Sequence, residues 1–142
     1  MRESKKVILE FDENSVETFK ALQKALKPAA GHEPTNRELF LLAMTYGYKH
    51  GAIGDQIKRS NTGVRVQFLL AEDQALMAAI QLGHDASTEN IADLERRYQL
   101  AELFAQGGIL LLRESVLDAV KYGHDLAAEV ISLLPDVFSD LD

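Results

Sequence analysis

The chain has 142 residues, of which 46% are hydrophobic and 26% are charged, and its formal net charge is −7 at pH 7. This size and composition are typical of one globular domain with its own core. The chain contains no cysteine, which excludes disulfides, thiolate metal sites and cysteine nucleophiles. Its apolar runs are too short for a signal peptide or a membrane span, so we expect a cytoplasmic protein without membrane contact.

The charge is distributed unevenly along the chain. Residues 1–65 contain 11 Lys and Arg against 8 Asp and Glu, whereas residues 66–142 contain 4 against 14. An anionic partner such as DNA is therefore expected to meet the N-terminal half, and a basic partner the C-terminal half. The same pattern is explained equally well by solubility alone, and the sequence leaves open whether the C-terminal acidity is functional.

The first half of the chain predicts a short strand and two helices. Alternating apolar residues within 5–11 predict the strand. A capping pattern at Asn14 precedes the first helix, which Pro28 is expected to end. Thr35 and Glu38 form a second capping box, and the helix that they begin is expected to end just before Gly51.

The second half predicts further helices after a basic, glycine-bearing loop at 51–64. A second short strand is indicated within 64–70. Apolar residues spaced by three and four then predict four helices, and the break between the fourth and the fifth is placed at a double glycine. The predicted boundaries are Glu72 and Gly83 for the third helix, Ser87 and Gly107-Gly108 for the fourth, Gly123 for the end of the fifth, and Asp125 and Pro135 for the sixth.

These elements predict a mainly α fold, a compact bundle of about six helices with one or two short strands. We expect a single domain over residues 1–142. Residues 1–12 would form a short strand or arm, and residues 136–142 an acidic tail.

The best candidates for contact with an anion or a partner are three basic residues in and beside the loop, Lys58, Arg59 and Arg65. Strong non-specific DNA binding takes roughly six to ten phosphate contacts, which is more than three bases supply. A loop that is merely solvated is the alternative.

No pattern indicates catalysis or a bound cofactor. The four histidines, at positions 32, 50, 84 and 124, do not have the spacing of a metal site. A glycine-rich phosphate-binding loop is also lacking. We therefore expect no catalytic, cofactor-binding or metal-binding residues, and a protein that is not an enzyme.

The order of strand, helix, turn and capped helix in the first fifty residues is also that of ribbon-helix-helix DNA-binding regulators. In that fold the outward face of the strand reads bases, and here this face would carry Lys6, Ile8 and Glu10. The carboxylate of Glu10 would be repelled by DNA, and the loop between the helices is longer than the turn of that fold. A transcriptional regulator of this type remains the alternative function.

Two segments resemble the family of DNA-phosphorothioation-associated protein 4, also called Dnd system-associated protein 4. The segment ELFLLAMTYGYKHG (Glu38 to Gly51) is similar to an apolar helix of that family with a Gly, aromatic, basic, Gly end. The segment RYQLAELFAQGGILLLRESV (Arg97 to Val116) is similar to its acidic and aromatic helix with a double glycine. The resemblance covers about residues 35–117, and Phe104-Ala105-Gln106 departs from the more usual Tyr-Ala-Asn.

The resemblance implies a non-catalytic accessory protein in bacterial defence against phage and foreign DNA. Such proteins accompany systems that replace a phosphate oxygen of DNA with sulfur, and their restriction partners. The expected mode of action is protein–protein contact, with a partner and an oligomeric state that the sequence leaves open. Only structural glycines are carried over, with expected roles in helix termination and close packing: Gly47, Gly51, Gly107 and Gly108.

Overall fold

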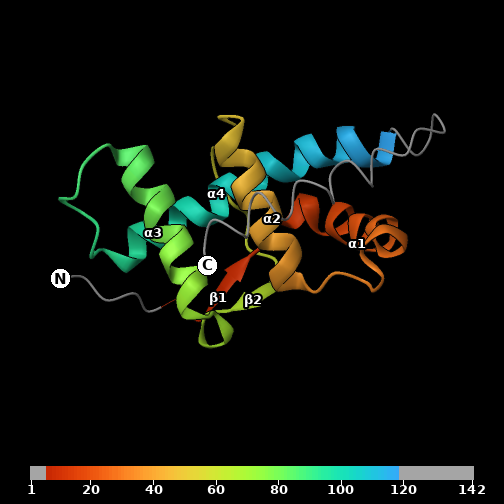
Figure 1. Cartoon of the computed structure of the whole chain (residues 1–142), viewed down its shortest axis with the longest axis horizontal. Coiled ribbons are helices and arrows are strands. Elements are labelled where there is room, and N and C mark those ends of the chain that lie inside the picture. The colour runs from red at the N-terminus through yellow and green to blue at the C-terminus, as the bar shows by residue number, and fades with distance from the viewer. Residues whose placement is uncertain (1–5, 119–142) are drawn as a thin grey trace.

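The computed structural model describes residues 6–118, which form four α-helices and one two-stranded antiparallel sheet (Figure 1). The mainly α class predicted from the sequence is confirmed, although four helices are described and not about six. The predicted sixth helix and the acidic tail lie outside the described residues. The strands are β1 Ile8–Glu10 and β2 Gly63–Arg65, and the α-helices are α1 Val16–Ala30, α2 Asn36–Lys49, α3 Ala71–Asp85 and α4 Leu94–Leu112. Two short 3₁₀ helices are η1 Glu13–Ser15 and η2 Val66–Phe68, and a π-helical segment, η3 Arg113–Asp118, follows α4.

Helix α4 is the longest element, and the other helices are arranged along it. Helix α2 crosses its middle, and α3 and α1 lie toward opposite ends (Figure 1). Helix α2 is buried almost all round, from Leu39 through Thr45, as expected for a helix in the centre of a core. Among the described helices, none is long and apolar enough to cross a membrane.

Helix α2 begins with the capping box that the sequence predicts. The Thr35 hydroxyl accepts a hydrogen bond from the Glu38 amide at 3.1 Å, and the Glu38 carboxylate accepts one from the Thr35 amide at 3.1 Å. This exchange satisfies two amides that have no partner within the helix. The helix ends as predicted, because Gly51 has a φ of 65° just after the C-cap His50.

Helix α4 runs without interruption through Gly107 and Gly108, so the predicted break at this position is wrong. The two glycines have ordinary helical backbone angles and are needed for space. A Cβ on Gly108 would overlap the carbonyl oxygen of Ala43 in α2, and a Cβ on Gly107 would overlap that of Ala52. Gly47 of α2 faces the same contact, where a Cβ would overlap the carbonyl of Phe104. The two helix backbones therefore approach more closely than side chains would allow.

Other predicted boundaries are also corrected. Helix α1 continues past Pro28 to Ala30 and ends at Gly31, whose φ is 82°. Its N-cap is Ser15 and not Asn14. Helix α4 begins after Asp93 and not after Ser87, because the Asp93 carboxylate accepts the Arg96 amide at 3.1 Å. Asn14 and Ser15 are both residues that favour N-caps, as are Ser87 and Asp93, and the local pattern alone does not select between them.

The sheet pairs β1 with β2 through Ile8↔Arg65, Leu9↔Val64 and Glu10↔Gly63. The predicted strand within 64–70 is shorter than expected, because η2 begins at Val66. Leu9 and Phe11 are buried in the core, where the Phe11 ring stacks against those of Phe19 and Phe40. Val7, on the same face of the strand, is 74% exposed.

Replacing Gly108 with alanine tests the close contact of α2 and α4. In an uncrowded helix this change raises the free energy of unfolding by about 1 kcal/mol, because alanine is the better helix former. Here the added Cβ overlaps a backbone carbonyl, so we expect a loss of about 1–3 kcal/mol. Chemical denaturation measures the change in the free energy of unfolding. A Gly108→Ala variant that is more stable than wild type would contradict the close contact of α2 and α4.

Candidate functional site

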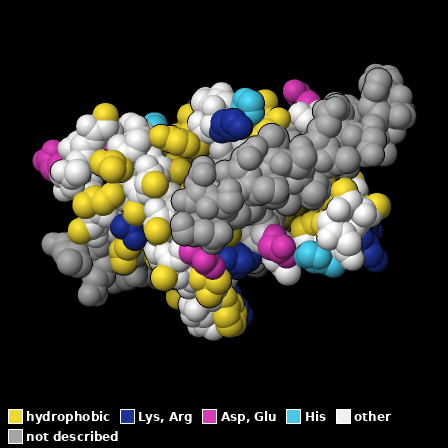
Figure 2. Space-filling model, viewed as in Figure 1, with side chains coloured by type: hydrophobic (Ala, Val, Ile, Leu, Met, Phe, Trp, Pro, Cys, Tyr) yellow, Lys and Arg dark blue, Asp and Glu magenta, His cyan; other side chains and the backbone are white. Residues whose placement is uncertain are grey.

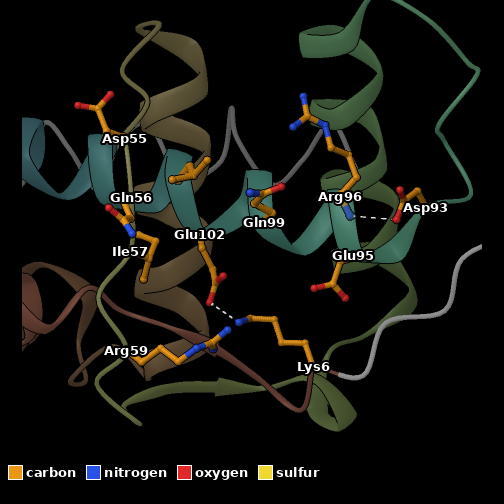
Figure 3. A pocket seen from close by; sticks show the side chains of 11 residues that line it. Lys6, Asp55, Gln56, Ile57, Arg59, Asp93, Glu95, Arg96, Gln99 and Glu102 are labelled. Carbon is orange, nitrogen blue, oxygen red and sulfur yellow. Dashed lines mark hydrogen bonds and ion pairs between the residues drawn. The ribbon is translucent and has the colours of Figure 1, made fainter.

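A charged cleft lies between the start of β1, the loop at residues 55–59 and the first half of α4 (Figure 3). Its volume is about 470 Å³. Charged side chains of both signs dominate its lining. They are Lys6, Asp55, Arg59, Asp93, Glu95, Arg96 and Glu102.

Glu10, behind the cleft, joins the loop to the sheet. Its side chain is only 2% exposed and accepts bonds from the Arg59 guanidinium at 2.5 Å and from the amides of Asn61 at 2.9 Å and Ser60 at 3.2 Å. Burial alone would raise the pKa of this carboxyl, but the bonds from Asn61 and Arg59 outweigh it and hold the pKa below its usual value. Glu10 is therefore held as a carboxylate that fixes residues 59–61.

Glu102 joins the same strand to α4. Its carboxylate accepts the Glu10 amide at 2.7 Å and the Lys6 ammonium at 3.0 Å. Figure 3 shows Lys6, Arg59 and Glu102 converging on one side of the cleft. Burial raises the pKa of Glu102, and the bonds from Glu10 and Lys6 oppose this only in part. Two carboxylates with opposite shifts are a pattern of acid–base sites, but protein donors occupy both of these.

The third cation of the cleft, Arg96, is also paired. Its guanidinium contacts the Asp85 carboxylate of α3 at 2.7 Å, and this bond lowers the pKa of Asp85. The Asp93 carboxylate accepts the Arg96 backbone amide at 3.1 Å. Lys6, Arg59 and Arg96 each have a carboxylate partner, so the cleft does not offer a cluster of uncompensated positive charge.

The three predicted contact residues do not lie together at this cleft. Arg59 lines it, with its side chain 75% exposed and its charge paired with Glu10. Lys58 is exposed, and its backbone amide donates to the Asp12 carboxylate at 2.8 Å. Arg65 is exposed on β2. Their role as anion or partner contacts stays a prediction.

Sequence reasoning missed Lys6, Glu10 and Glu102 as one cluster. Glu10 occupied a polar position on a strand and Glu102 a polar position on a helix, and such residues are usually solvated. The two are 92 positions apart. No local spacing could have paired them.

The histidines do not converge in the described part of the chain. His32 lies 3.4 Å from the Glu38 carboxylate, His50 packs against Tyr46, and His84 packs edge-on against Phe104. Within residues 6–118, no group of three His, Asp or Glu is arranged to hold a metal ion. The fourth histidine lies outside these residues.

Comparison with known proteins adds no residue assignment to this geometry. No protein-family model, curated protein or solved structure matches the chain.

Replacing Glu10 with glutamine tests the joint between sheet and loop. At pH 7 we expect the free energy of unfolding to fall by about 1–3 kcal/mol, because charge-assisted bonds become neutral ones. The pKa of Glu10 in the folded protein lies below the usual value of a glutamate. The stabilisation is therefore complete above the unfolded pKa and is lost as the pH falls through the folded pKa. The difference in the free energy of unfolding between wild type and Glu10→Gln should therefore become smaller at acidic pH.

Chemical denaturation at a series of pH values measures this difference. The matched control is Glu17→Gln, because the Glu17 side chain is 89% exposed and only weakly paired with Lys20. The control should match wild type throughout. A Glu10→Gln variant as stable as wild type at pH 7 would show that the joint is unimportant.

Proposed function

We propose that this chain is a non-catalytic accessory protein of a bacterial defence system linked to DNA phosphorothioation, and that it acts through protein–protein contacts. One observation supports this most strongly. The two segments that carry the family resemblance, Glu38 to Gly51 and Arg97 to Val116, contain α2 and most of α4, which pack on each other. Gly47, Gly107 and Gly108 meet at or beside that contact. The two segments that resemble the family therefore belong to one packing unit.

The surface supports contact with a protein more than contact with a polyanion. The cations of the charged cleft are already paired with carboxylates. Large apolar side chains are exposed just before β1 and shortly after β2, where Val7 is 74% and Phe68 is 61% exposed. Figure 2 shows hydrophobic side chains gathered over the segment that follows β2. Aromatic and aliphatic side chains grouped in this way are typical of protein interfaces.

Affinity purification of the tagged full-length chain from its native host tests the proposal. We expect proteins of the DNA-phosphorothioation machinery or its linked restriction system to co-purify, with yields that depend on salt if charged contacts contribute. The control is the same purification from a host in which those genes are deleted. Recovery of the chain alone at low and at high salt would contradict the proposal.

The DNA-binding alternative draws support from the exposed side chains of Lys58 and Arg65. The ribbon-helix-helix version of it needs a strand face that is open to DNA. Here β1 pairs with β2 of the same chain, and Glu10 on that face is buried against Arg59. We therefore favour protein contact.

Binding to a DNA duplex at about 50 mM and about 200 mM salt separates the two functions, because phosphate contacts weaken steeply over this range. We expect no detectable affinity at either concentration. Binding at low salt that is lost in a Lys58→Glu, Arg65→Glu double variant would favour the DNA-binding function instead.

A further inference from the structure

A second cavity lies next to the charged cleft along α4. The second cavity has a volume of about 520 Å³ and lies between residues 52–56 and the second half of the helix, at Gln106, Gly107, Leu110 and Leu111. Asp55 and Gln56 line both cavities. The two neighbouring cavities are together called here the α4 groove, and their lining extends along α4 from Glu95 to Leu111. At about 1.5 Å per helical residue its length is roughly 24 Å, enough for about seven residues of extended chain.

The two ends of the α4 groove differ in chemistry. At the charged end, the lining residues Asp55, Asp93, Glu95 and Glu102 outnumber Lys6, Arg59 and Arg96. Glu10 and Asp85, which pair with two of these cations, add further negative charge. This end therefore favours a cation. The other end is apolar, and Ile53 and Leu110 at its rim are 40% and 42% exposed.

A buried acceptor lies at the apolar end. The side-chain oxygen Oε1 of Gln106 is buried and has no hydrogen-bond partner in the described part of the chain. Buried polar atoms are almost always paired, since an unpaired one costs about 1–3 kcal/mol. Gln106 lines the groove beside Gly54, where a Cβ would overlap it. This oxygen is covered by Gly54, whose amide donates to the Leu103 carbonyl at 2.8 Å, so a ligand in the groove does not reach it.

We propose that the α4 groove binds an extended peptide segment of a partner protein. The segment places an apolar side chain between Ile53 and Leu110 and directs a Lys or Arg toward Asp55. This inference rests on the proposed function, because it specifies how a protein partner is recognised.

Charge argues against the C-terminal segment of this chain as the occupant. Residues 119–142 contain one Lys against five Asp and Glu. That segment would bring negative charge to a groove whose polar end is already negative. A basic and apolar segment from another protein complements both ends.

The test uses a phage-displayed library of random twelve-residue peptides, selected on the immobilised full-length protein. We expect enriched peptides to combine an apolar residue with Lys or Arg a few positions away. Fluorescence polarisation with the synthetic peptides then measures affinity for variants of the groove. Leu110→Asp and Asp55→Lys should each weaken binding at least about tenfold.

Two further variants separate binding from folding. Leu82 of α3 is 40% exposed and does not line the groove, so Leu82→Asp is the matched control and should bind like wild type. Gln106→Leu removes a buried acceptor that has no hydrogen-bond partner among the described residues, so its melting temperature should stay the same or rise. A purely structural Gln106 would give the opposite change in melting temperature.

Several results would overturn the proposal. These are a lack of enriched peptides, enrichment of acidic peptides, or equal binding to the Leu110→Asp and Leu82→Asp variants. Displacement of the library peptides by a synthetic 119–142 peptide would identify this chain as the occupant, and a dimer that Leu110→Asp dissociates would identify a second copy. If native partners still co-purify with Leu110→Asp and Asp55→Lys, the groove proposal fails and the proposed function stands.

Discussion

The close approach of α2 and α4 is the constraint on which the rest of the structure depends. Side chains normally hold two packed helix axes 8–10 Å apart, and glycine is the residue that lets backbones come closer. Gly47 and Gly108 face each other across this contact, where neither has room for a Cβ. Helix α2 is thereby buried nearly all round, and α4 becomes the spine along which α1 and α3 are placed (Figure 1).

A second constraint fixes the irregular segment between α2 and α3. Glu10 binds the loop at Arg59 and Asn61, and Glu102 of α4 binds the Glu10 amide. Two carboxylates thus connect a loop, a strand edge and a helix with few regular backbone bonds. Glu102 bears a burial cost, visible as its raised pKa, whereas the donors around Glu10 more than offset the cost of its burial. Both carboxylates therefore have a structural role, because their hydrogen bonds connect separate parts of the fold.

These two constraints together create the α4 groove. The close contact of α2 and α4 places Gly107 directly beside Ala52, so that residues 52–56 lie alongside α4. Glu10 binds Arg59 at the other end of the same loop. The groove is therefore lined by a long helix and by a loop that is anchored at both ends. A partly preformed groove would reduce the ordering cost of the peptide binding proposed above.

The sequence by itself determined the helical class, the capping box at Thr35 and Glu38, and the end of α2 at Gly51, because these depend on local spacing and on neighbouring residues. The family resemblance implied roles in helix termination and close packing for the glycines at 47, 107 and 108, and the sequence pattern placed a helix break at the double glycine. Whether a glycine ends a helix or admits a neighbour depends on what lies across from it, and for Gly108 that is Ala43, far away in sequence. The cluster of Lys6, Glu10 and Glu102 could not be predicted for the same reason, because Glu102 is distant in sequence from the other two. Only the tertiary structure could show such contacts, because they form between residues that are distant in sequence and meet only when the chain folds.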